Sequence, residues 1–235
     1  MKEATLDHVV HEGHNIYTFW LKPEVKIDQI AGQFIEVHLP NTSPDSRGTK
    51  RWFTISSSPT SKELIAITTK MADKNSSSFK AELRAMEKGH KLKISDPMGD
   101  FVLPRDDNIP LVFIAGGIGI TPFHSIIEYL KDKSEKRQIQ LFYGVRSLDE
   151  LVFEKELKEY ERLEFIPVIQ NAPTNYHGQT GFLNSEYIFK QIKDIENSRI
   201  YISGPEPMVE KFKKEFEDLG VNKNNLVCDY FPGYI

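Results

Sequence analysis

The chain has 235 residues, 39% of them hydrophobic and 27% charged, which is typical of a globular protein with one large domain or two smaller ones. A formal net charge of −4 argues against nucleic acid or an anionic membrane as a partner, and without a long apolar stretch or a visible signal peptide we expect no membrane insertion and a cytoplasmic location. Because Cys228 is the single cysteine and no His-Glu-x-x-His spacing occurs, we expect no disulfide, no bound metal and no iron–sulfur cluster held within the chain.

The first hundred residues read as short strands separated by turn residues. One helix interrupts them at 78–86, where Phe79 and Leu83 share a face. Strands this short and this frequent predict a small antiparallel barrel. The predicted strands cover residues 4–10, 17–21, 33–39, 51–56, 63–69 and 91–95.

After Pro104 the pattern changes to alternating strands and helices. The first strand, 110–115, is wholly apolar, as expected for a strand buried on both faces of a parallel sheet. Strands at 139–143, 164–169, 199–202 and 225–230 alternate with helices at 121–131, 149–160, 185–191 and 206–219. We therefore predict an N-terminal antiparallel β-barrel domain over residues 1–104 and a C-terminal Rossmann-like α/β domain with a parallel sheet over residues 105–235.

A glycine-rich turn joins strand 110–115 to its helix. Glycines at 116, 117 and 119 allow a ligand to approach the backbone closely, and Thr121 and Pro122 suit the N-cap and the first helical position. The free N–H groups of such a helix end favour an anion such as a pyrophosphate. The turn departs from Gly-x-Gly-x-x-Gly because Pro122 stands third, and by itself it is also compatible with a ligand-free connection.

A second motif, Arg51 to Thr54, lies on a predicted barrel strand. Arg51 and Phe53 should share one face, with Trp52 and Thr54 on the other. Taken alone, an arginine beside aromatic residues is more often a surface cation–π pair than a binding site.

Together these motifs resemble the ferredoxin–NADP reductase superfamily, and the resemblance covers nearly the whole chain. Four family motifs occur in the family's order. In the first half of the chain these are Arg-x-aromatic-Ser/Thr at 51–54, followed by Ser58-Pro59, and Gly-Pro-x-Gly-x-Phe, which appears as Asp96 to Phe101. In the second half they are Gly-Gly-x-Gly-x-Thr-Pro at Gly116 to Pro122 and Cys-Gly-Pro, which appears as Ser203-Gly204-Pro205.

The resemblance implies a bound FAD in the barrel domain. Arg51 would pair with its pyrophosphate, Phe53 would lie against the flavin, and Thr54 would hydrogen-bond near flavin N5. The family's Gly-x-x-Ser motif at a helix start is reduced to Asn75-Ser76-Ser77-Ser78. Serines in this position are equally good helix caps. The residues predicted to hold FAD are Arg51, Trp52, Phe53, Thr54, Thr69, Ser77 and Ser78.

The resemblance also implies a nicotinamide coenzyme in the second domain, NADH or NADPH. Gln170 and Asn171 follow the third parallel strand where the family often places an arginine, so we lean to NADH. Arg146 would reverse the preference for NADH if its side chain reached the 2′-phosphate of NADPH. The alternative role of Arg146 is that of a solvated residue before a capping box at Ser147 to Glu150. The predicted coenzyme contacts are Gly116, Gly117, Gly119, Thr121, Pro122, Arg146, Gly204 and Pro205.

The predicted catalytic residues are Thr54, Ser203 and Asp229. Asp229 and Phe231 resemble the family's acidic-x-aromatic ending, and Tyr230, Phe231 or Tyr234 would cover the flavin, although a docked final strand explains these residues equally well. The implied reaction is hydride transfer between nicotinamide and flavin N5, with electrons passed to a separate carrier such as ferredoxin or flavodoxin. A reductase subunit of a larger complex, such as a multicomponent oxygenase, and a non-redox nucleotide-binding regulatory module remain as alternatives.

Overall fold

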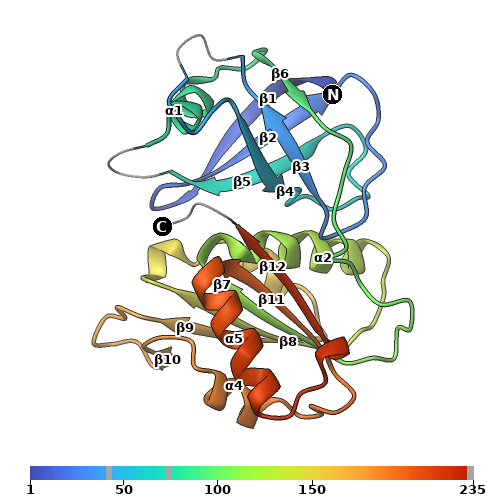
Figure 1. Ribbon diagram of the computed structural model, residues 1–235, viewed down its shortest axis with the longest axis vertical. Coiled ribbons are helices and arrows are strands. Elements are labelled where there is room, and N and C mark those ends of the chain that lie inside the picture. The colour runs from blue at the N-terminus through green and yellow to red at the C-terminus, as the bar shows by residue number, and fades with distance from the viewer. Residues whose placement is uncertain (41–43, 72–75, 232–235) are drawn as a thin grey trace.

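The computed structural model describes residues 1–40, 44–71 and 76–231. Residue 231 is described for its backbone alone. The predictions for Asn75, for the side chain of Phe231 and for Tyr234 lie outside the described residues. The chain forms two six-stranded sheets, and Figure 1 shows the first sheet stacked above the second, with helix α2 between them.

The first sheet is antiparallel throughout, with the order β4-β3-β6-β1-β2-β5. An isolated bridge between Ile55 and Ile67 brings its two outer strands, β4 and β5, together, so the sheet curls as the predicted barrel requires. Its strands are β1 (Lys2–Gly13), β2 (Ile16–Pro23), β3 (Phe34–His38), β4 (Lys50–Thr54), β5 (Ile65–Lys70) and β6 (Lys91–Ile94).

Helix α1 (Ser78–Ala85) closes one end of this sheet (Figure 1). Phe79 and Leu83 are fully buried, as their four-residue spacing predicts, and they pack with Ile35 and Val37 of β3. Alternate residues of the strands therefore meet the helix in one core.

The second sheet is parallel, with the order β10-β9-β8-β7-β11-β12, which confirms the predicted α/β class. One face packs on α2 and α3, and the other packs on α4 and α5, so both faces are covered. The elements are β7 (Leu111–Gly116), α2 (Thr121–Asp132), β8 (Ile139–Val145), α3 (Glu154–Lys158), β9 (Leu163–Ile169), β10 (Gln179–Thr180), α4 (Ser185–Gln191), β11 (Arg199–Pro205), α5 (Glu206–Asp218) and β12 (Leu226–Phe231).

The helix predicted at 149–160 is wrong, and so is its capping box. A short 3-10 turn (Leu148–Glu150) comes first, Phe153 then takes a left-handed conformation (φ 63°), and α3 begins at Glu154. Ser147 bonds the side chain of Asp149, while Glu150 pairs with Lys70 of β5 at 2.5 Å. Contacts with the barrel domain thus override the local helical pattern.

Hydrogen bonds from α2 attach the barrel to the second domain. His124 Nδ1 donates to the Ser56 carbonyl at 2.8 Å, and Ser125 Oγ donates to the Ser57 carbonyl at 2.7 Å.

The predicted boundary at residue 104 stays a prediction; Phe101, which precedes it, already packs against Phe123 in the second domain's core. None of the described helices is both long and apolar enough to cross a membrane.

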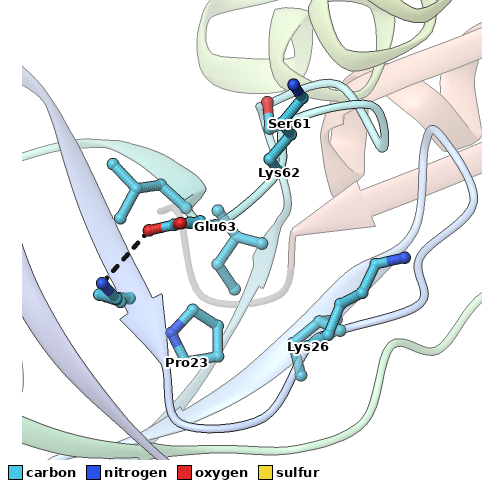
Figure 2. Close-up of a pocket in the computed structure, with 9 residues that line it drawn as sticks. Pro23, Lys26, Ser61, Lys62 and Glu63 are labelled. Carbon is cyan, nitrogen blue, oxygen red and sulfur yellow. Dashed lines mark hydrogen bonds and ion pairs between the residues drawn. The ribbon is translucent and has the colours of Figure 1, made fainter.

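The interdomain ion pair yields a stability prediction. Glu150→Ala should lower the free energy of unfolding by about 1–2 kcal/mol, because it leaves the Lys70 ammonium half-buried without its acceptor. Urea unfolding measures this change. Glu63→Ala is the matched control: Glu63 pairs with Lys22 at 3.2 Å at an exposed position (Figure 2), so stability should not change measurably. Equal losses in the two variants would contradict the assignment of Glu150 to the interface.

Candidate functional site

The C-terminal ends of three neighbouring parallel strands carry most of the predicted coenzyme residues. β7 ends at Gly116, β11 at Pro205 and β12 at Phe231, and these strands are neighbours in the sheet. Figure 1 shows β12 running toward the barrel. Ligands of open parallel sheets bind at this edge, so the fold places the candidate site between the two domains.

The glycine turn after β7 touches the loop after β11. A Cβ built on Gly119 would lie 2.2 Å from the carbonyl oxygen of Ser203, and one on Gly204 would lie 3.2 Å from the Cα of Gly116. These glycines therefore allow two backbones to meet. Sequence reasoning assigned them to ligand approach and missed this second role, since nothing local in the sequence reports on a distant loop.

The predicted N-cap at Thr121 is wrong. A 3-10 turn over Gly117–Ile120 runs directly into α2, so the chain is already helical at this residue, and Thr121 Oγ1 donates to the Ile118 carbonyl at 3.0 Å. Pro122 lies in the first turn of α2, as the second residue of the helix and one position later than predicted. Thr121 and Pro122 are both buried, whereas Gly117, with φ +52° and open space beside it, is partly exposed.

Two helical starts converge at this edge of the sheet. The 3-10 turn begins after Gly116 and α5 begins after Pro205, and neither of these described starts has a side-chain cap. Their uncapped N–H groups and positive dipole ends favour an anion between them. This supports the anion-binding role predicted for the turn.

Ser203 and Asp229 are register partners on β11 and β12, so their side chains point to the same face of the sheet. Tyr201 and Val227, two residues before each, pack in the core on the α2 side, so this face is the one turned to the barrel. Ser203 is fully buried, and its hydroxyl has no hydrogen-bond partner among the described residues. Burial, with a smaller contribution from the Asp100 carboxylate, raises the pKa of Asp229 to about 6.

The predicted alternation on β4 is confirmed. Arg51 and Phe53 pair with Val37 and Ile35 and share their face, while Trp52 and Thr54 lie on the other. Phe53 is 5% exposed and stacks on Phe79 with ring centroids 5.9 Å apart, so its ring lies inside the barrel core. Its predicted contact with a flavin stays a prediction.

The face of β4 that carries Thr54 presents a different aromatic residue. Trp52 is 58% exposed and lies 6.1 Å from the ring of Phe34, measured between centroids. Thr54 itself is buried, and its Oγ1 has no hydrogen-bond partner in the described part of the chain. Thr69, on β5, is also fully buried.

The residues predicted for the flavin pyrophosphate come together around the start of α1. The Arg51 guanidinium lies over the Phe79 ring at 5.3 Å and donates to the carbonyls of Arg47 and Lys50. Ser77 is the N-cap of α1 and accepts from the Lys80 amide at 3.1 Å, so the capping alternative holds for this serine. Ser78 instead contacts Asp45, a residue that sequence reasoning missed.

Arg146 is exposed after β8. Its carbonyl accepts from the Asn171 amide at 2.7 Å, which places it beside the two amide residues that follow β9. The structure therefore brings together the backbones of the two segments on which the coenzyme prediction depends.

Two hollows lie away from these residues. One, of about 180 Å³, is lined by the ends of β2 and β5, with Pro23, Lys26 and Glu63 around it (Figure 2); the other, of about 250 Å³, lies near Gln29 and Arg137. No predicted site residue lines either one. Within the described ranges, no cluster of three histidine, cysteine or acidic side chains is arranged to hold a metal.

Comparisons with known proteins match this architecture. Residues 113–214 match the family model of the oxidoreductase NAD-binding domain. The chain is 26% identical over 234 residues to CDP-6-deoxy-L-threo-D-glycero-4-hexulose-3-dehydrase reductase of Yersinia pseudotuberculosis, covering 96% of this chain and 67% of that protein. It is 28% identical over 197 residues to a probable flavin reductase of Photobacterium leiognathi, covering 81% of each.

A solved structure extends the match to both domains. The ferredoxin NADP⁺ reductase from Neisseria gonorrhoeae, with bound FAD and NADP, aligns with a TM-score of 0.81 at 20% identity and covers 97% of both chains. This likeness concerns the fold. The chain spans about two thirds of the length of its Yersinia relative, so that protein has further sequence with no counterpart here.

The contact between the two loops predicts that alanine substitutions at two glycines of the turn lower the free energy of unfolding by different amounts. Gly119→Ala should destabilise the fold by about 3 kcal/mol, because its Cβ would overlap a backbone oxygen and force the loops apart. Gly117→Ala, which has open space, should lose about 1 kcal/mol, the cost of a left-handed alanine. Urea unfolding measures both. A neutral Gly119→Ala would show that the loops do not touch.

Proposed function

We propose that the chain is a member of the ferredoxin–NADP reductase superfamily of FAD- and NAD(P)-binding oxidoreductases, and that it moves a hydride from NADH to a bound FAD and passes the electrons to a separate redox protein. The observation that carries this proposal is a pair of buried hydroxyls, Thr54 Oγ1 and Ser203 Oγ, one in each domain, without a partner among the described residues. A buried polar group left unpaired costs about 1–3 kcal/mol, so such groups often mark a ligand contact.

At the coenzyme end, the chain's contribution is an anion-binding edge. The open side of Gly117 and the uncapped starts after Gly116 and Pro205 would hold the coenzyme's pyrophosphate. The Ser203 hydroxyl and the Asp229 carboxyl lie on the face turned to the barrel, where they would meet the nicotinamide.

At the flavin end, β4 supplies the contacts. Thr54 Oγ1 would hydrogen-bond the flavin near N5, with Trp52 on the same face, while Arg51, Ser77 and Ser78 would meet the pyrophosphate. When bound, the flavin accepts a hydride at N5 and releases electrons singly; the protein positions the two rings and supplies charge.

Asp229 is suited to favour hydride donation. Nicotinamide gains positive charge as it loses a hydride, and an ionised carboxylate nearby stabilises that charge. Since the pKa of Asp229 is about 6, the group is mainly ionised at neutral pH. Ser203, its register partner, would orient the ring through its hydroxyl.

The coenzyme preference rests on the residues after β8 and β9. Gln170 and Asn171 offer amides, which suit a ribose hydroxyl better than a phosphate dianion. Arg146 is the nearby cation, and it is exposed. These features support NADH.

The electron acceptor is proposed to be a separate redox protein, such as a ferredoxin or flavodoxin, because one cysteine cannot hold an iron–sulfur cluster within this chain. A reductase component of a larger complex is the second candidate, favoured by the Yersinia relative, whose name pairs it with a dehydrase. Ferricyanide reduction by the isolated chain supports an autonomous reductase; its absence, with FAD bound, supports the component.

The coenzyme proposal is tested by steady-state kinetics of the FAD-loaded chain with ferricyanide as acceptor. The KM for NADH should be lower than that for NADPH, by roughly tenfold, a difference of about 1.4 kcal/mol. Arg146→Ala should leave the KM for NADH unchanged. If the wild type instead has a lower KM for NADPH than for NADH, and the KM for NADPH rises in Arg146→Ala, the NADH preference is overturned and Arg146 is assigned to the 2′-phosphate.

The role of Asp229 predicts a pH profile. The rate of flavin reduction by NADH should rise as the pH increases through about 6, since the carboxyl ionises there. Asp229→Asn should flatten the profile and slow reduction roughly tenfold, the effect of about 1.4 kcal/mol in the barrier. Asp100→Asn is the control: removing this second carboxylate should shift the profile to lower pH and keep the maximal rate. A profile unchanged in Asp229→Asn would contradict the assignment.

A further inference from the structure

Asp45, in the β3–β4 connection, binds the start of α1. Its carboxylate accepts from the Ser78 amide at 2.9 Å, and its own amide donates to Ser78 Oγ at 2.9 Å. Arg47 holds the same carboxylate from the other side, with Nη2 at 2.7 Å and its backbone amide at 3.0 Å. The chain thus presents its own anion to the helix end proposed for the flavin pyrophosphate.

The other groups proposed for that phosphate are also engaged within the chain. Of the first three amides of α1, that of Ser78 binds Asp45 and that of Lys80 binds the Ser77 hydroxyl. Arg51 Nη1 binds two backbone carbonyls, at 2.7 and 2.6 Å. The two ends of the proposed flavin site therefore differ: Thr54 Oγ1 has no described partner, whereas the phosphate end already holds a carboxylate.

A carboxylate and a phosphate cannot both occupy one helix start, because both need the same N–H donors and repel each other. On the basis of the FAD function proposed above, we propose that Asp45 determines flavin specificity: it occupies the position of the flavin phosphate, must leave when FMN or FAD binds, and leaves riboflavin, which has no phosphate, unaffected. The affinity for a phosphorylated flavin is then reduced by the fraction of molecules in which Asp45 holds the site.

Changes in pH do not remove this competition. The hydrogen bond from Arg47 and the one from the Ser78 amide lower the pKa of Asp45 to about 2, so the carboxylate stays charged under ordinary conditions. Its charge is therefore tested by substitution. Asp45→Asn keeps the size of the side chain and an oxygen that can accept from the Ser78 amide.

The experiment measures the dissociation constants of riboflavin, FMN and FAD by quenching of flavin fluorescence, for the wild-type chain and for Asp45→Asn. Asp45→Asn should bind FAD and FMN about 3- to 30-fold more tightly, the range for removing a competing anion from a helix end. Its affinity for riboflavin should be unchanged. Asp106→Asn is the matched control, because it removes the same charge from a carboxylate that accepts a similar turn hydrogen bond, from the Asn108 amide, and it should leave all three constants at wild-type values.

Riboflavin binding also reports whether the isoalloxazine site of Asp45→Asn is intact. Equal FAD affinity in the wild type and in Asp45→Asn, or the same gain for riboflavin as for FAD, would overturn the role of Asp45 while leaving the proposed FAD function in place. If both the wild type and Asp45→Asn are folded and neither binds FAD, that function and this inference are contradicted together.

Discussion

Helix α2 fixes the distance between the two halves of the site. It begins at the glycine turn, and three residues into the helix His124 and Ser125 bond the carbonyls of Ser56 and Ser57, just beyond Thr54 on the barrel chain. Burial lowers the pKa of His124, so the ring is neutral and its Nδ1–H donates. One element therefore carries the loop proposed for the coenzyme at its start and holds the strand proposed for the flavin along its side. Phe153, stacked on His124, keeps the imidazole in place.

The order of strands and helices could be predicted because periodicity is local. Residues 185–191 form the helix that was expected, and Phe79 and Leu83 are buried as their spacing requires. The 149–160 segment failed because its structure is decided elsewhere: Glu150 pairs with a lysine of the barrel. The two-residue strand β10 was missed because both of its residues are exposed and carry no apolar pattern.

The candidate site could be predicted at the level of loops but not of contacts. The motifs located the turn at Gly116, the strand with Arg51 and the loop at Ser203, and the fold places the two loops proposed for the coenzyme in contact. What sequence reasoning missed depends on distant partners: Gly119 against Ser203, and Asp45 against Ser78. An aspartate in a polar connection gives no local signal that it faces a helix end.

Electron transfer from coenzyme to flavin on this one chain is tested most directly by anaerobic mixing of the FAD-loaded protein with one equivalent of NADH. The two-domain arrangement predicts complete loss of the visible flavin absorbance with consumption of one NADH per flavin, since α2 joins the two proposed cofactor sites on the same molecule. Bound FAD that keeps its absorbance while NADH remains unoxidised would contradict the proposed function.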